Sequence, residues 1–198
     1  MSTISGLRQF NTRSLAVVAL IVVAFTGGNL WFHRGGPPVG YTRFQDFSLQ
    51  FDYPNYMHLY VEGLGTPEPS EETGTLTVER QGPIMDQAGI IWLTQDMASG
   101  PSEVLDLIFT QASGSETVIE RGDKIKSTIN GQETVIEFFY IDDRGYNIPG
   151  VIGAWSCNEN HRVIALYYLW LPDAESAGSP AEDLQPAWEL HLSHLKCH

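Results

Sequence analysis

An uninterrupted run of eleven apolar residues near the N-terminus, Leu15–Phe25, constrains this chain more than any other feature. Arg8 and Arg13 precede the run, and no acidic residue does. Taken over residues 14–32, the segment would form a helix about 28 Å long at ~1.5 Å per residue. That is just long enough for the ~30 Å hydrocarbon core of a bilayer. The two arginines predict that residues 1–13 stay in the cytoplasm, so that the rest of the chain lies outside it.

A cleaved signal peptide is the main alternative, because basic residues followed by a short apolar stretch are typical of one. The small residues Thr26, Gly27 and Gly28 make only a passable cleavage site, and no cysteine follows the run as a lipoprotein would require. We therefore favour a single-pass transmembrane anchor over residues 14–32. A buried core helix is a third interpretation. Both leading interpretations export the remainder of the chain.

The segment 33–40, HRGGPPVG, reads as a Gly/Pro linker, and residues 41–198 are enough for one domain with its own core. Beyond residue 38 the chain holds 24 acidic and 8 basic residues, a net charge of −16. Such a surface disfavours nucleic acid and anionic lipid. It would attract cations or a basic protein, although solubility alone would also explain it.

The chain has two cysteines, Cys157 and Cys197. An even count in an exported domain predicts one disulfide. Closing a loop of about 40 residues would be worth roughly 4 kcal/mol in the chain-entropy model. Two buried thiols are the alternative.

Alternation of apolar and polar residues predicts a succession of strands. Asn130-Gly131 is a strong signal for a two-residue hairpin, and the apolar stretch VIALYYLWL predicts a central strand. The expected strands are 47–53, 57–62, 75–80, 89–93, 116–120, 124–129, 133–141, 151–157 and 162–171.

Two helices are expected in the domain. The first covers Pro101–Ala112, with proline at its first position and Val104, Leu105 and Ile108 on its buried side. The second opens with a capping box at Ser179 and runs to the C-terminus, with one shared face that comprises Leu184, Ala187, Trp188, His191 and Leu195. This order of elements predicts the α+β class, with a mainly antiparallel sheet flanked by helices.

Four segments, in their order and spacing, resemble the PsbP-like family, which comprises the extrinsic photosystem subunit PsbP and its prokaryotic relatives. They are DFSLQFDYPNY at 46–56, STINGQETVIEFFY at 127–140, HRVIALYYLW at 161–170 and the final helix ending LHLSHLKCH. The resemblance implies an α/β/α sandwich of PsbP type, here preceded by one N-terminal transmembrane helix. It also implies a non-enzymatic role, since PsbP docks on a membrane complex and helps it to retain inorganic ions. This chain departs from plant PsbP in its apolar segment and in its acidity, so the resemblance leaves the partner open.

One cluster has the chemistry of metal ligands: His191, His194, Cys197 and His198 near the C-terminus. Imidazole and thiolate suit zinc or copper. In a continued helix, however, Cys197 would point away from the His191 face, which fits a disulfide better. We expect no metal and no cofactor, and keep the three histidines as minor candidates.

The remaining polar groups have ordinary explanations. Asp142 and Asp143 are typical turn residues, and the carboxylates of Glu68, Glu71 and Glu72 lack the spacing of a calcium loop. Gly63–Gly74 reads as an exposed acidic loop suited to docking, and Trp92 as a core residue or a displayed one. No catalytic or phosphate-binding motif is present.

The sequence thus predicts a non-catalytic accessory domain, anchored in the cell membrane with its N-terminus in the cytoplasm. It would be a subunit or assembly factor of a membrane protein complex. The alternative hypothesis is an exported metal-binding or redox-linked protein that uses the C-terminal His/Cys cluster.

Overall fold

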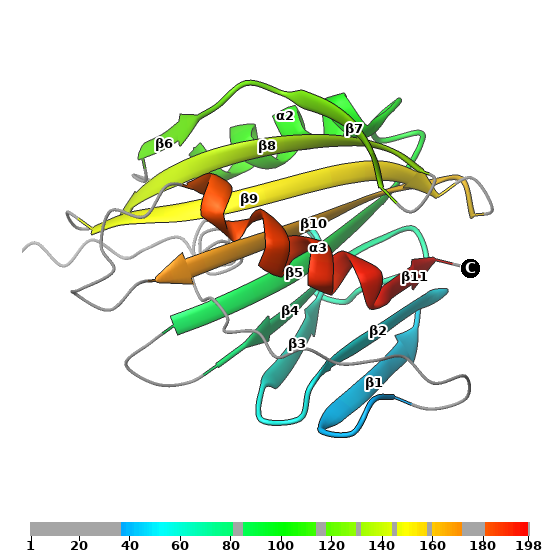
Figure 1. The fold of residues 1–198 in the computed structure, drawn as a ribbon. Coiled ribbons are helices and arrows are strands. Elements are labelled where there is room, and N and C mark those ends of the chain that lie inside the picture. Colours follow the sequence, from blue (N-terminus) through cyan, green and yellow to red (C-terminus); the bar gives the residue numbers. More distant parts are fainter. Residues whose placement is uncertain are drawn as a thin grey trace, which may run out of the picture.

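The computed structural model describes residues 37–80, 85–113, 118–129, 132–143, 146–157, 160–171 and 181–197. Strands dominate this part of the chain (Figure 1). They are β1 (Tyr41–Asp46), β2 (Leu49–Pro54), β3 (His58–Glu62), β4 (Thr73–Glu79), β5 (Met85–Thr94), β6 (Val118–Arg121), β7 (Ile125–Ile129), β8 (Gln132–Asp143), β9 (Tyr146–Cys157), β10 (Arg162–Leu171) and β11 (Leu195–Cys197). The helices are α2 (Pro101–Ser113), the 3-10 helix η2 (Ala181–Leu184) and α3 (Gln185–Ser193).

Eight of the strands form one antiparallel sheet, in the order β3-β4-β5-β10-β9-β8-β6, with β7 also paired to β8. Strand β10 lies centrally, as its apolar sequence predicted. Its side chains are buried on both faces of the sheet, so an alternating pattern would not suit it. The β7–β8 register pairs Ile129 with Gln132, as expected for the predicted two-residue hairpin.

Each face of the large sheet carries its own hydrophobic core. On one face α2 packs over β9 and β10, with Val104, Leu105 and Phe109 buried against the sheet. On the other face lie η2, α3 and a small sheet of order β1-β2-β11. Leu49 and Phe51 of β2 are buried in this second core. Figure 1 shows α3 lying across the strands of the large sheet, with β1 and β2 below it.

The expected fold class, an α/β/α sandwich with helices flanking the sheet, is wrong. The domain is mostly antiparallel sheet, and its two α-helices have only 13 and 9 residues. On the α3 side, the three-stranded sheet supplies much of the cover that a helical layer would give. The α+β expectation assigned the whole C-terminal segment to a helix, and so overestimated the helical share.

The C-terminal segment differs from the expected helix in a specific way. Helix α3 ends at Ser193, and the chain then extends as β11, which pairs with β2. Leu195 is therefore a buried residue of strand β11, and it does not share a helical face with Trp188 and His191. The predicted capping box at Ser179 lies outside the described residues.

The predicted transmembrane segment 14–32 also lies outside the described residues. Within the part of the chain that the structure describes, no helix is long and apolar enough to cross a membrane. Residues 38–40, which the sequence assigned to a linker, are fastened to the domain. Pro38 is buried, the Tyr41 N–H donates to the Pro38 carbonyl at 3.0 Å, and the Asn55 N–H donates to the Gly40 carbonyl at 2.9 Å.

Candidate functional site

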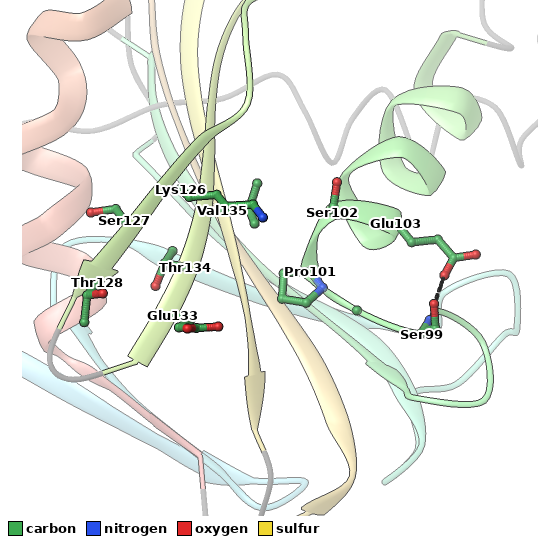
Figure 2. A pocket seen from close by; sticks show the side chains of 11 residues that line it. Ser99, Pro101, Ser102, Glu103, Lys126, Ser127, Thr128, Glu133, Thr134 and Val135 are labelled. Atoms are coloured by element: carbon green, nitrogen blue, oxygen red, sulfur yellow. Dashed lines mark hydrogen bonds between the residues drawn. The ribbon is translucent and has the colours of Figure 1, made fainter.

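A groove of about 620 Å³ lies between the start of α2 and the β7–β8 hairpin (Figure 2). Lys126 and Val135 form its hairpin side, and Pro101 and Ser102 its helix side. Hydroxyl groups and two carboxylates account for most of its other polar atoms. The full lining is Ser99, Gly100, Pro101, Ser102, Glu103, Lys126, Ser127, Thr128, Glu133, Thr134 and Val135.

The helix end in this groove already has its hydrogen-bond partners. Glu103 Oε2 accepts from the Ser99 N–H at 2.8 Å and from Ser99 Oγ at 2.6 Å, which lowers the pKa of Glu103. The N–H groups of Glu103 and Val104 both donate to the Gly100 carbonyl. Because these N–H groups already have an acceptor, the start of α2 has few donors left to bind an anion. The lining of the groove contains no histidine or cysteine.

The predicted disulfide is present. Cys157 at the end of β9 is bonded to Cys197 in β11, with their Cα atoms 6.3 Å apart. The bond joins the large sheet to the small one. While it is closed, Cys197 has no thiolate to offer a metal.

The C-terminal histidines do not converge on a metal site. His191 is buried between Tyr168 of β10 and Phe51 of β2, with ring centroids 5.6 and 6.4 Å away. His194 is also buried and stacks on Tyr41 at 5.1 Å. His198 lies outside the described residues. Among the residues that are described, no group of three His, Cys, Asp or Glu side chains could hold a metal ion.

Burial controls the titration of both histidines. It lowers the pKa of His191 to about 3, with a smaller contribution from His194. Burial likewise lowers the pKa of His194, and the nearby Asp52 carboxylate opposes that shift. Asp52 is itself buried and forms a two-pronged ion pair with Arg43, at 2.7 and 2.9 Å. His191 and His194 are therefore uncharged at neutral pH, and they lie where the two sheets pack together.

The predicted loop Gly63–Gly74 ends two residues earlier, because Thr73 and Gly74 belong to β4. The remaining acidic loop, 63–72, is exposed along most of its length, and its end is tied to the core. Arg162, whose side chain is only 6% exposed, pairs with Glu71 and donates to the Phe47 carbonyl. Trp92 is fully buried and donates from Nε1 to the Ser70 carbonyl at 2.9 Å. Trp92 is thus a core residue and is not displayed on the surface. Its hydrogen bond and the Arg162–Glu71 pair fix the position of the end of the loop. Asp142 and Asp143 are the last residues of β8.

A tyrosine corner, comprising Val39, Tyr41, Tyr56 and Arg80, was missed by the sequence analysis. It lies where the N-terminal segment joins the domain. Val39 is 93% exposed and Tyr56 53%, and the Arg80 guanidinium lies 5.9 Å from the centre of the Tyr56 ring. The hydrogen bond from the Asn55 N–H to the Gly40 carbonyl brings the segments of Tyr41 and Tyr56 together. Burial and Tyr56 raise the pKa of Tyr41. Their grouping depends on the pairing of β1 with β2, and β1 carries little alternation in its sequence.

Comparison with known proteins gives a likeness at the level of fold. No protein-family model matches the chain, and no curated protein matches its sequence. The solution structure of cyanobacterial PsbP (CyanoP) from Synechocystis sp. PCC 6803 matches with a TM-score of 0.55 and 12% sequence identity, over 86% of this chain and 100% of that one. A protein of unknown function from Pseudomonas aeruginosa matches over 80% of this chain and 97% of its own, also at 12% identity. Its TM-score of 0.38 is too low to support an argument. The chain therefore has a PsbP-like fold, while membership of the family stays a prediction.

Proposed function

We propose that this chain is a non-catalytic accessory domain, anchored in a membrane and facing away from the cytoplasm, that docks on a protein complex of the same membrane. The observation that carries the proposal is the fold shared with cyanobacterial PsbP over 86% of the chain. A fold alone does not fix a function, so the membrane part of the proposal rests on the apolar segment 14–32 and its preceding arginines.

The acidic loop 63–72 is the surface that we propose for docking. It carries Glu68, Glu71 and Glu72, and its neighbour Glu62 ends β3. Arg162 and Trp92 hold the end of the loop through Glu71 and Ser70, so a partner would meet a partly ordered surface and lose less conformational entropy on binding. Complementarity with these carboxylates calls for a partner with a basic surface.

Purification of the full chain in mild detergent tests this function. We expect the tagged protein to bring down the same set of membrane proteins in repeated preparations. The double variant Glu68→Lys/Glu72→Lys should weaken that recovery at least tenfold, because it reverses two exposed charges and leaves the Arg162–Glu71 pair intact. The matched control is Glu120→Lys/Glu182→Lys, which makes the same charge change at exposed positions elsewhere.

Two results would count against the proposal. Migration as a lone monomer in every mild detergent would contradict the accessory role. Equal loss of recovery in both double variants would show that net charge matters and that the loop itself is not the docking surface.

A further inference from the structure

The tyrosine corner lies at the point where the chain enters the domain. The described chain begins at Pro37, and from Pro38 onward it is held by the hydrogen bonds from Tyr41 and Asn55. The corner is therefore a fixed part of the domain surface, next to the segment that leads to residues 14–32. We propose that this corner rests on the lipid headgroups around the anchor, and this inference rests on the proposed membrane anchor.

The length of the connecting segment limits how far the domain can stand from the bilayer. Six peptide steps separate Phe32, the last residue of the predicted anchor, from Pro38. A chain of that length spans at most about 21 Å. The headgroup layer itself takes up about 5–8 Å of that distance. With the anchor in the bilayer, Pro38 therefore lies at most about 13–16 Å beyond the headgroup layer.

The residues of the corner suit this position. Tyrosine is enriched where a membrane meets water, because its ring is apolar and its hydroxyl is polar. Tyr56 and Val39 are both exposed, and the hydrogen bond from the Asn55 N–H to the Gly40 carbonyl brings their segments together. The Arg80 guanidinium lies over the Tyr56 ring.

The direction of the strands then places the acidic loop away from the bilayer. Strand β3 begins at His58, close to Tyr56 in sequence, and ends at Glu62, where the loop starts. Strand β4 returns from Thr73 to Glu79, next to Arg80. In Figure 1 β3 and β4 run side by side, so the tyrosine corner and the acidic loop occupy opposite ends of one hairpin. Resting the corner on lipid presents the loop to a partner rather than to the membrane.

A depth measurement on the full chain tests the inference. The chain is placed in phosphatidylcholine vesicles that contain a lipid with a nitroxide on its headgroup. An environment-sensitive dye is attached at Asn55→Cys, beside the corner, or at Glu68→Cys in the acidic loop. We expect the dye at position 55 to be quenched at least threefold more strongly than the dye at position 68.

Substitution of the corner gives the second arm. Val39→Ser/Tyr56→Ser should lower quenching at position 55 at least twofold, whereas the control Met97→Ser, which removes an apolar side chain that is 50% exposed elsewhere, should leave it unchanged. Val39→Ser alone, at a residue that is 93% exposed, serves if the double variant unfolds.

The outcomes separate this inference from the proposed function. Equally weak quenching at both positions, in a chain that stays with the vesicles after a high-salt wash, would overturn the lipid contact and leave the anchor intact. A chain that leaves the vesicles would overturn the anchor itself.

Discussion

At the scale of single residues, buried polar groups mark the places where sequence patterns were least informative. Asp52 is an acidic residue within the predicted strand 47–53, yet it is only 1% exposed. Arg43 of β1 covers it with two hydrogen bonds. Glu137 is similarly buried and bonded to Arg121. Such burial depends on a partner brought by another strand, and a single strand's pattern cannot reveal it.

Protonation of His191 should make stability depend on pH. Burial depresses the pKa of His191 in the folded state to about 3, so the unfolded chain binds a proton first as pH falls below about 6.5. Stability is therefore complete above pH 6.5 and decreases as pH falls from there towards 3. From pH 7 to pH 5 the loss should be about 2 kcal/mol for this residue, measured by urea unfolding followed through tryptophan fluorescence.

The variant His191→Phe separates this effect from other titrations. Phenylalanine keeps an aromatic ring beside Phe51 and Tyr168 and cannot be protonated, so the His191 share of the loss, about 2 kcal/mol, should disappear between pH 7 and 5. Any loss caused by His194 should remain. His58→Gln, which removes an exposed imidazole, is the control variant. An unchanged slope in His191→Phe would show that burial of this ring does not set the acid sensitivity.

At the scale of elements, α3 is positioned by a close contact with β9. Gly153 leaves room for the Trp188 ring, because a Cβ at that position would lie 2.2 Å from a ring carbon. Trp188 is fully buried and donates from Nε1 to the Leu166 carbonyl at 2.7 Å. Gly153→Ala should therefore displace the helix and cost about 1–3 kcal/mol of unfolding free energy, with faster amide exchange in α3.

A second glycine provides the control for that prediction. Gly100→Ala adds the same methyl group where nothing lies within 4 Å, so stability should stay near that of the wild type. If the two variants are equally stable, the contact between Gly153 and Trp188 does not position α3.

The sequence predicted helices and strands correctly where packing against the core requires a regular spacing of apolar residues. The strands that line the large sheet and the buried side of α2 were found by alternation and helical spacing. Strands β1 and β11 were missed. The first is mostly exposed and the second has three residues, so neither carries enough apolar positions to show a period. Both exist because β2 offers each of them an edge to pair with.

At the scale of the whole molecule, the Cys157–Cys197 bond is the covalent link between the two sheets. Removing it should lower the unfolding free energy by about 4 kcal/mol, since it closes a loop of about 40 residues. Urea unfolding of Cys157→Ala/Cys197→Ala measures this loss, and reduction of the wild-type chain tests the same bond without a change in side-chain volume. An unfolding midpoint that reduction leaves unchanged would contradict the prediction.

The last prediction for the whole molecule concerns retention of the N-terminal segment. Mature protein should retain Met1–Phe32 and stay with membranes after a high-salt wash, because an apolar helix holds by hydrophobic transfer rather than by charge. Intact mass decides between the two main interpretations. A polypeptide that begins near Asn29 would identify a cleaved signal peptide and leave export unaffected.

The small sheet also has a consequence for the order in which the molecule assembles. Strand β2 pairs with β11, so Phe51 meets Leu195 across nearly the whole described chain. Synthesis delivers residues from the N-terminus onward, and contacts this distant in sequence close last. The strands up to β10 can complete the large sheet while Leu49 and Phe51 still lack part of their cover. A nascent chain arrested before Leu195 would therefore contain a folded large sheet while the apolar side chains of β2 remain partly exposed. Chaperones bind intermediates that expose apolar strands in this way.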